Sequence, residues 1–360
     1  MNQDAYRKLV SGERSGPGAL LLRFVLGIVA QVYRVIICLR NFLYSKGWLR
    51  VHRANAVVIS IGNITTGGTG KTPLVIRLCR QLISDSQFQL SNSQCAILTR
   101  GYKTNQNYQN EPAILAESCP GVQVVVNPDR VAGAAEAVSR FGVKVLIMDD
   151  GFQHRRLGRD LDIVTIDSTV PFGYGKLLPA GLLREPVDSL KRADAAIITR
   201  CDRVAEAELT QLEGKLRQIN PEMVVARSVH APVCAKSMDN REISFEELKG
   251  EKIFAFCGIG NPDAFLNTVK TLGAELVGSK VFDDHYHYTD ECLADIDEQA
   301  RRLNAELILT TQKDWFSFPS SAMSDASEDV DFAYLAIELR FISGEDEITE
   351  LIKNALAVRI

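Results

Sequence analysis

The chain has 360 residues, of which 46% are hydrophobic and 24% are charged, a composition that supports a full-sized buried core and leaves room for two domains. Its formal net charge of -4 and pI near 5.9 argue against a whole-surface attraction to nucleic acid, so no nucleic-acid partner is expected. The eight cysteines include no CxxC pair, which favours reduced thiols in the cytoplasm over a zinc or redox site.

Residues 1–53 form a basic and apolar N-terminal arm. Residues 20–43 are strongly apolar, but Arg23, Arg34 and Arg40 interrupt the run at intervals too short for a clean hydrocarbon span. This pattern favours a helix that lies on an anionic membrane surface with its arginines among the headgroups. A buried core helix of a soluble protein is the alternative, and whether the helix lies flat or spans stays open.

Residues 54–225 alternate short β-branched runs with helical stretches. We expect strands at 56–61, 96–99, 122–126, 143–148, 162–166 and 195–199, and helices at 73–84 and 129–141. Continuous apolar strands separated by helices are typical of a parallel sheet covered on both faces, with ligands at the carboxyl ends of the strands. The fold class is therefore α/β.

A phosphate-binding loop follows the first of these strands. The run 62–73 reads GNITTGGTGKTP and leads into a helix, which is the context that a P-loop requires. Backbone N–H groups of the glycine-rich turn can bind phosphate oxygens, Lys71 can reach the β and γ phosphates, and Thr72 can hold Mg²⁺. The predicted ATP-binding residues are Thr65, Thr66, Gly67, Gly68, Thr69, Gly70, Lys71 and Thr72. Thr65 stands where the strict GxxxxGKS/T pattern has its first glycine.

An apolar strand that ends in two acids supplies the usual partner of such a loop. The strand 143–148 runs into Asp149 and Asp150. Adjacent carboxylates are unfavourable unless a cation lies beside them, so we predict Thr72, Asp149 and Asp150 as Mg²⁺ ligands. A simple strand-to-turn junction is the alternative, because Asp is common in turns.

Residues 226–360 are predicted to form a smaller α/β domain after an extended connecting ribbon at 223–240. Strands are expected at 253–257, 307–310 and 333–337, and helices at 262–272 and 289–303. The polar run around Ser320 is expected to be a loop.

The run at 149–164, DDGFQHRRLGRDLDIV, is more specific than the motifs that P-loop proteins share. In this run the chain resembles the tetraacyldisaccharide 4'-kinase family. Further agreement comes from 62–73, RGYK at 100–103, Asp129-Arg130, LPAG at 178–181, LREP at 183–186, GIGNP at 258–262, DHY at 284–286 and TQKD at 311–314. The resemblance implies a P-loop kinase-type domain, a second α/β domain and a membrane-associated N-terminal helix at the cytoplasmic face of the inner membrane.

The resemblance also implies an activity and a site. The family transfers the γ-phosphoryl group of ATP to the 4'-hydroxyl of an acylated glucosamine disaccharide 1-phosphate, a lipid A precursor. The positions that match its nucleotide and acceptor cleft are Arg100, Tyr102, Arg130, Gln153, His154, Arg184 and Glu185. Taken singly, each arginine is more often a solvated surface residue.

One position departs from the family pattern. The family carries an aspartate where this chain has Asn110, and that aspartate is thought to act with the histidine that matches His285 on the acceptor hydroxyl. Asn110 cannot accept a proton, so the alternatives are that Glu111 or Asp149 is the base or that His285 acts with a different partner. Phosphoryl transfer depends mainly on positioning and charge, so this change need not abolish activity.

The sequence is also compatible with two other functions. The GGTGKT loop alone would also serve a GTPase or a nucleotide-driven metal-insertion protein, although Thr311-Gln312-Lys313-Asp314 does not have the NKxD spacing that reads guanine. The second alternative is a nucleotide-binding membrane protein with impaired catalysis, which Asn110 alone supports.

Overall fold

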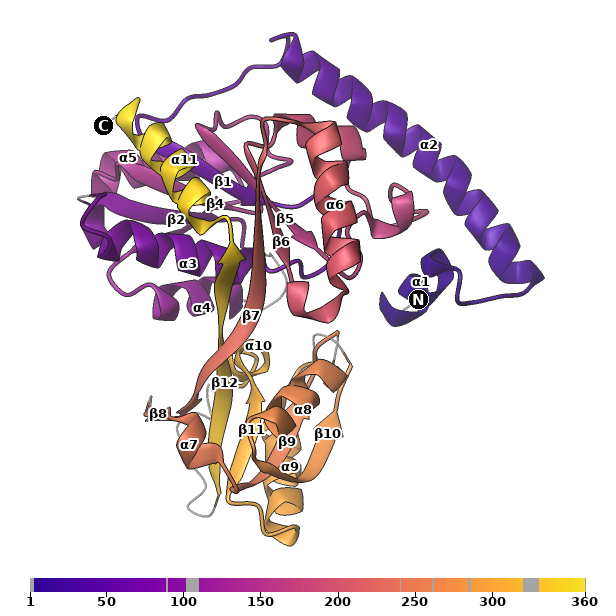
Figure 1. The fold of residues 1–360 in the computed structure, drawn as a ribbon, viewed down its shortest axis with the longest axis vertical. Coiled ribbons are helices and arrows are strands. Elements are labelled where there is room, and N and C mark those ends of the chain that lie inside the picture. The colour runs from indigo at the N-terminus through magenta and orange to yellow at the C-terminus, as the bar shows by residue number, and fades with distance from the viewer. Residues whose placement is uncertain are drawn as a thin grey trace. The chain divides into compact units, whose positions relative to one another are not determined.

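A computed structural model describes residues 3–88, 90–101, 110–239, 241–260, 262–283, 286–319 and 330–359. Its contacts divide the chain into two compact units. Unit 1 comprises residues 1–101, 115–230 and 339–360, and unit 2 comprises residues 102–114 and 231–338. Figure 1 traces the chain through both units.

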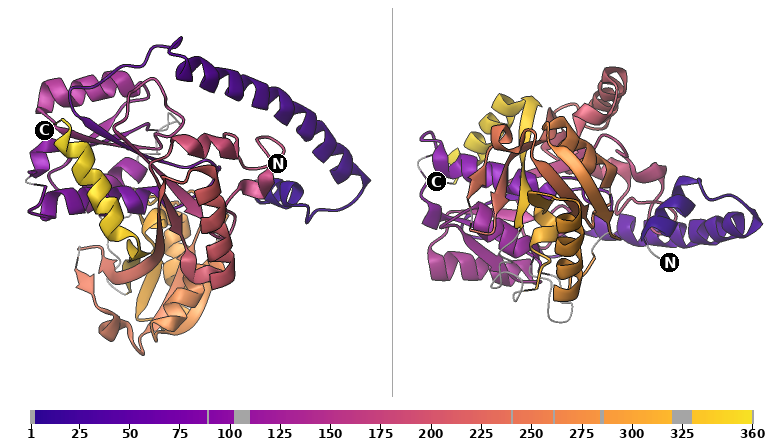
Figure 2. Two further views of the ribbon diagram at one scale, coloured as in Figure 1. Left: turned by 45° about the horizontal axis from the view of Figure 1, so that its top comes forward. Right: turned by 90° about the horizontal axis from the view of Figure 1, so that it is seen from below.

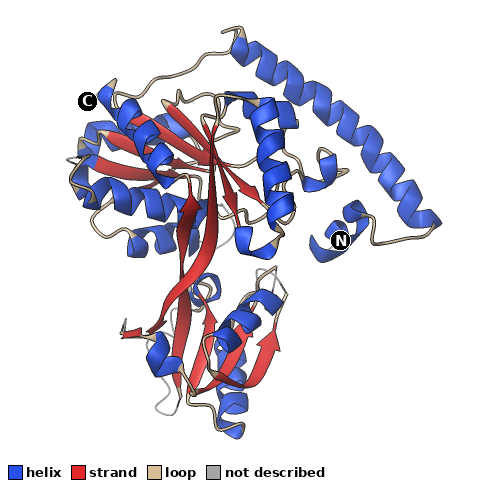
Figure 3. Cartoon of the chain, in the orientation of Figure 1, coloured by secondary structure: helices blue, strands red, loops and turns tan. Residues whose placement is uncertain are grey.

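Unit 1 is built on a parallel sheet with the strand order β7-β6-β5-β1-β4-β2-β3. The strands are β1 (Val57–Gly62), β2 (Cys95–Thr99), β3 (Gln123–Val126), β4 (Val145–Asp149), β5 (Leu161–Asp167), β6 (Ala195–Thr199) and β7 (Val224–Ser237). The central strands β1, β2, β4 and β6 are buried along their whole length. Their continuous apolar sequence is explained by helices on both faces of the sheet, seen in Figure 3.

Alternate residues of β1 point to opposite faces of this sheet. Val57, Ile59 and Ile61 pack with α3 (Lys71–Ser84), α4 (Asn110–Ser118) and α11 (Glu345–Ala357). Val58 packs on the other side with α5 (Arg130–Phe141). Helix α6 (Glu206–Ile219) covers β5 and β6. The predicted α/β class is confirmed.

In unit 2 the strands run parallel in the order β10-β9-β11-β12. The strands are β9 (Lys252–Cys257), β10 (Glu275–Val281), β11 (Leu307–Thr311) and β12 (Asp331–Ser343). Helix α8 (Pro262–Thr271) packs on one face and α9 (Asp290–Arg302) on the other. The short elements β8 (Glu242–Ile243), α7 (Phe245–Leu248) and α10 (Gln312–Trp315) complete its described part.

The extended ribbon expected at 223–240 is the long strand β7. One feature departs from the sequence-based division. Residues 339–360, which the sequence assigned to the smaller domain, group with unit 1. The reason is the apolar face of α11, where Ile348, Ile352 and Leu356 are buried in the core of unit 1. The expected loop at 320–329 lies outside the described residues.

The arm forms two helices, α1 (Gln3–Ser11) and α2 (Pro17–Ser45). Within the described residues, α2 is the one helix long and apolar enough to cross a membrane by length and composition. Its buried residues are Ala19, Ala30 and Ile37, whereas large apolar side chains such as Leu21, 65% exposed, and Phe24, 67% exposed, face outward. This exposure is incompatible with a buried core helix. Figure 2 shows α2 as one unbroken helix.

Candidate active site

The loop between β1 and α3 has the backbone shape of a phosphate-binding turn. Gly67 has φ +109° and Gly70 has φ +88°, in the left-handed region that favours glycine. A Cβ atom on Gly70 would lie 2.7 Å from Nε2 of His230. Helix α3 then begins at Lys71, so the loop ends at a helix N-terminus, where free N–H groups and the helix dipole attract anions.

Buried hydroxyl and amide groups hold this loop from inside unit 1. The amide of Asn63 donates to Oγ1 of Thr69 at 2.9 Å, and the Thr69 and Thr165 hydroxyls lie 2.7 Å apart. The Thr199 hydroxyl donates to the Thr69 carbonyl at 3.0 Å. Thr69 is therefore a structural support of the loop, fixed to β5 and β6.

The segment 182–184 holds the loop along its other edge. The backbone N–H of Thr66 donates to the Leu182 carbonyl at 2.8 Å, and the backbone N–H of Arg184 donates to the Ile64 carbonyl at 2.7 Å. Thr65 and Leu183 form an antiparallel bridge between them. The phosphate loop and the LREP segment, far apart in sequence, are thus joined by main-chain hydrogen bonds.

The first charged cluster of the site centres on Asp150, which follows β4 with φ +52°. Lys71 Nζ lies 3.5 Å from its carboxylate, and Arg184 donates to both carboxylate oxygens at 2.8 and 2.9 Å. Burial raises the pKa of Asp150, but Lys71 and Arg184 outweigh it and hold that pKa below its usual range. Gln153 accepts from Arg184 at 3.4 Å and donates to the Asn63 carbonyl at 2.8 Å.

Asp149 and Arg130 are more deeply buried than Asp150. Asp149 closes β4 and is only 4% exposed. Arg130, 3% exposed, donates to the carbonyls of Asn127 at 2.9 Å and Asp149 at 3.2 Å. Arg130, expected as an acceptor-binding residue, thus braces the main chain behind the two acids. Burial, with Arg130 nearby, lowers the pKa of His154, which favours a neutral imidazole at pH 7.

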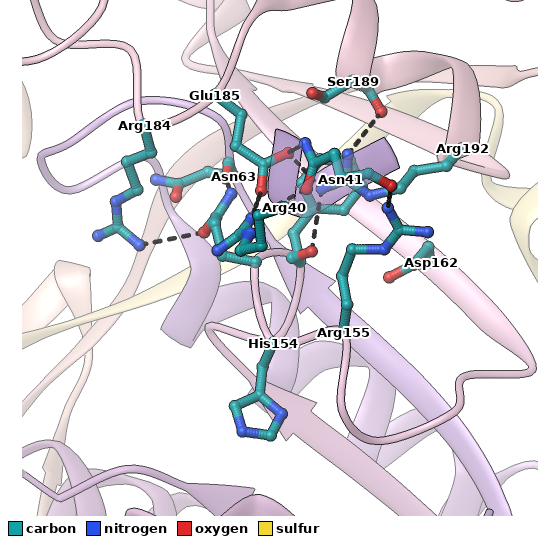
Figure 4. Close-up of polar contacts among 12 residues, drawn as sticks. Arg40, Asn41, Asn63, His154, Arg155, Asp162, Arg184, Glu185, Ser189 and Arg192 are labelled. Atoms are coloured by element: carbon teal, nitrogen blue, oxygen red, sulfur yellow. Dashed lines mark hydrogen bonds and ion pairs between the residues drawn. The ribbon is translucent and has the colours of Figure 1, made fainter. Parts of the chain in front are cut away.

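A second charged cluster joins the arm to the site (Figure 4). Glu185, also expected in the acceptor cleft, is instead fully buried. Its carboxylate accepts from Arg40 at 2.6 Å and Asn41 at 3.2 Å and pairs with Arg192 at 2.7 Å. Removing one partner would leave a buried charge uncompensated and would lower the free energy of unfolding by about 3–5 kcal/mol. The cluster therefore holds in place the segment that carries Arg184.

Sequence reasoning missed several residues of this cluster. The Tyr33 hydroxyl donates to the Arg184 carbonyl at 2.8 Å, and the Arg192 guanidinium lies 3.7 Å from the ring centre of Phe152. The sequence pattern predicts Arg40 among lipid headgroups, whereas in the structure it donates to the buried Glu185 carboxylate. No spacing signal connects positions 33, 40 and 192, since they meet only in the folded chain.

The remaining predicted site residues lie at several places in the chain. Arg100 follows β2 and is exposed, and Thr72 lies half-buried in the first turn of α3. Asn110 and Glu111 begin α4 but group with unit 2, where Glu111 is exposed. Tyr102 and His285 lie outside the described residues.

Comparison with known proteins decides the family. Residues 22–357 match the family model described as tetraacyldisaccharide-1-P 4'-kinase. The chain belongs to this family. The tetraacyldisaccharide 4'-kinase of Syntrophus aciditrophicus is 40% identical over 326 residues, covering 83% of this chain and 84% of that protein. That of Halothermothrix orenii is 33% identical, covering 86% and 87%.

A solved structure supports the same membership. LpxK from Aquifex aeolicus, described as crystallised in complex with ATP, is 28% identical and superposes with a TM-score of 0.71. The match covers 93% of this chain and 99% of that one. Helix α1, at residues 3–11, lies before the part that matches the tetraacyldisaccharide-1-P 4'-kinase model.

Proposed function

We propose that this protein transfers the γ-phosphoryl group of ATP to the 4'-hydroxyl of a tetraacyldisaccharide 1-phosphate, a lipid A precursor. The observation that carries the proposal is the supported glycine loop at the head of α3, with Lys71 and Arg184 converging on Asp150, in a chain of the tetraacyldisaccharide-1-P 4'-kinase family. The ATP named for the Aquifex aeolicus structure supports ATP as the donor.

The loop residues would bind the nucleotide phosphates through their backbone N–H groups. Lys71 is 3.5 Å from Asp150 in the structure and can move to the β and γ phosphates when these arrive. In the transfer, the bond from the γ-phosphorus to the bridging oxygen of the departing ADP breaks while the bond to the acceptor oxygen forms. Lys71 and Arg184 would stabilise charge on the phosphoryl oxygens.

The donor set fits Mg²⁺. Thr72, Asp149 and Asp150 offer hard oxygen ligands, which Mg²⁺ prefers. Within the described residues, no group of three or more His, Cys, Asp or Glu side chains could hold a metal by itself. Mg²⁺ is usually bound through one or two carboxylates together with substrate phosphates. When bound, Mg²⁺ would offset phosphate charge.

The acceptor proton needs a base. His285, which the family resemblance implies, and Glu111 are the candidates that the sequence offers in place of an aspartate at position 110, and Asp149 is the third. Arg100, Tyr102, Gln153 and His154 remain proposed acceptor or nucleotide contacts. The exposed apolar surface of α2 supports a peripheral or monotopic location, which we place at the cytoplasmic face of the inner membrane.

The test is phosphoryl transfer by the intact chain in detergent micelles with labelled ATP, Mg²⁺ and tetraacyldisaccharide 1-phosphate. We expect label in the lipid product and a new 4'-phosphate resonance. An acceptor blocked at the 4'-hydroxyl is the control. ATP turnover that is the same with free acceptor, blocked acceptor and no acceptor would contradict the proposed substrate.

A further inference from the structure

Helix α1 lies outside the family match, yet it is docked on the candidate active site. Leu9 is fully buried and Val10 is 5% exposed. The Tyr6 hydroxyl donates to the carbonyl oxygens of Pro179, at 3.1 Å, and Gly181, at 2.8 Å. Apolar burial and hydrogen bonds therefore both hold this helix to the 179–181 segment.

That segment continues into the strand edge that supports the phosphate loop, where the Thr66 N–H donates to Leu182. As a result, α1 brings Arg7 to the loop. A Cβ atom built on Gly67 would lie 3.2 Å from Nη2 of Arg7. Gly67 is the third residue of the loop that begins at Thr65, within the glycine pair that precedes Lys71.

The other cations near the loop already have anionic partners. Lys71 and Arg184 contact Asp150. Arg200 forms an ion pair with Asp167 and donates to the Gly68 carbonyl at 2.7 Å. Within the described part of the chain, no hydrogen-bond acceptor or carboxylate pairs with the half-buried Arg7 guanidinium. The Arg7 guanidinium is therefore a partly desolvated cation beside a phosphate-binding loop, and a phosphate bound in that loop would be its anionic partner.

We propose that Arg7 is a catalytic residue, an arginine finger supplied in cis that donates to the phosphoryl oxygens of the bound nucleotide. This assignment rests on the proposed function. As the bond from the γ-phosphorus to the ADP oxygen breaks and the bond to the acceptor oxygen forms, negative charge lies on the transferred group and on the leaving oxygen. The acceptor proton leaves to the base, and Arg7 stabilises the charge without exchanging a proton. Tyr6 is its positioning residue.

The test compares Arg7→Ala with Arg14→Ala, which removes an exposed arginine of the same arm. Assays use saturating ATP and Mg²⁺ in neutral detergent micelles, where no anionic lipid headgroup is present. We expect kcat to fall about 100-fold for Arg7→Ala, to fall less for Arg7→Lys, and to stay near wild type for Arg14→Ala. Millimolar guanidinium should restore part of the activity of Arg7→Ala alone, which a structural role would not produce.

Two results would overturn the assignment. One is equal kcat for Arg7→Ala and Arg14→Ala. The other is a loss that appears on anionic vesicles and not in neutral micelles, which would assign Arg7 to lipid headgroups. Binding of a non-hydrolysable ATP analogue separates this proposal from the proposed function: weaker binding by Arg7→Ala supports the phosphate contact even if the wild-type chain phosphorylates no disaccharide, and unchanged binding in that case overturns it.

Discussion

Helices α2 and α3 are both rich in apolar residues, but they are held in place by different forces. In α3, of 14 residues, Leu74, Leu78 and Leu82 are fully buried under the sheet. In α2, of 29 residues, the large apolar side chains are mostly exposed. Its described contacts with the rest of unit 1 include the polar groups of Tyr33, Arg40 and Asn41.

The difference is between a helix that is fixed by apolar burial and a helix that is fixed by polar contacts. Burial of about 25 cal/mol per Å² of apolar surface fixes α3 and therefore fixes Lys71 at its first position. The polar anchors of α2 orient the helix while leaving its apolar surface available to a lipid phase. The same anchors reach Arg184 through its carbonyl and Glu185 through its carboxylate, so the attached helix still supports the site.

The largest expected effect is at the head of α3. Lys71→Ala removes the cation that reaches the phosphates, and kcat should fall by about 10³-fold while the melting temperature stays near that of wild type. Turnover in micelles and thermal unfolding measure the two quantities. A well-folded Lys71→Ala protein that keeps most of its turnover would refute the P-loop assignment.

The second prediction compares how much α3 and α2 contribute to the free energy of unfolding. Leu78→Ala should lower the free energy of unfolding by about 2–5 kcal/mol, because it opens a cavity in a close-packed core. Leu39→Ala, at a position 55% exposed in α2, should change it by no more than about 0.5 kcal/mol in lipid-free solution. Urea unfolding checks both. Equal losses would mean that α2 is packed as a core helix.

A third experiment addresses the outward surface of α2. Leu21, Phe24 and Ile28 are exposed at helical spacing, so replacing all three by Ser should weaken binding to anionic vesicles by about 100-fold. Arg7, Tyr33 and Arg40 stay intact, so micellar turnover should change little.

Vesicle sedimentation measures that binding. A control chain with Val126, Ile342 and Val358 replaced by Ser loses comparable exposed apolar groups elsewhere in unit 1. We expect it to bind vesicles as wild type does. An equal loss in both chains would place the membrane contact outside α2.

The smallest effect concerns the pH dependence of the Asp150 contacts with Lys71 and Arg184. The folded-state pKa of Asp150 is lowered, so its contribution to stability is present above the unfolded-state pKa of about 3.9 and is lost as pH falls through the folded value. Asp150→Asn should therefore lower the free energy of unfolding by about 1–2 kcal/mol. This loss should be constant from about pH 5 to 8 and smaller at lower pH.

Urea unfolding across pH measures that difference. Asp188→Asn, which removes an exposed carboxylate near Lys191, serves as the control and should show a difference near zero throughout. A difference that instead grows below about pH 5 would mean that Asp150 gains rather than loses stabilising contacts on protonation.

The sequence by itself determined the local chemistry. The apolar runs predicted β1, β2, β4 and β6 to within a few residues, and the GGTGKT loop and the acids at 149–150 follow from residue order alone. Because parallel strands end at one edge of a sheet, the loop and the acids had to meet there. The 3.5 Å contact of Lys71 with Asp150 agrees with that expectation.

Only the tertiary structure decided which distant side chains support that edge. Glu185 is buried between Arg40 and Arg192, Arg130 turns inward to the Asp149 carbonyl, and α11 returns to the first unit. Neither periodicity nor spacing predicts these pairings, because the sequence pattern around an arginine is the same whether its side chain contacts water, lipid or a buried carboxylate. Its role is set by desolvation and by the partner that folding brings within hydrogen-bond distance.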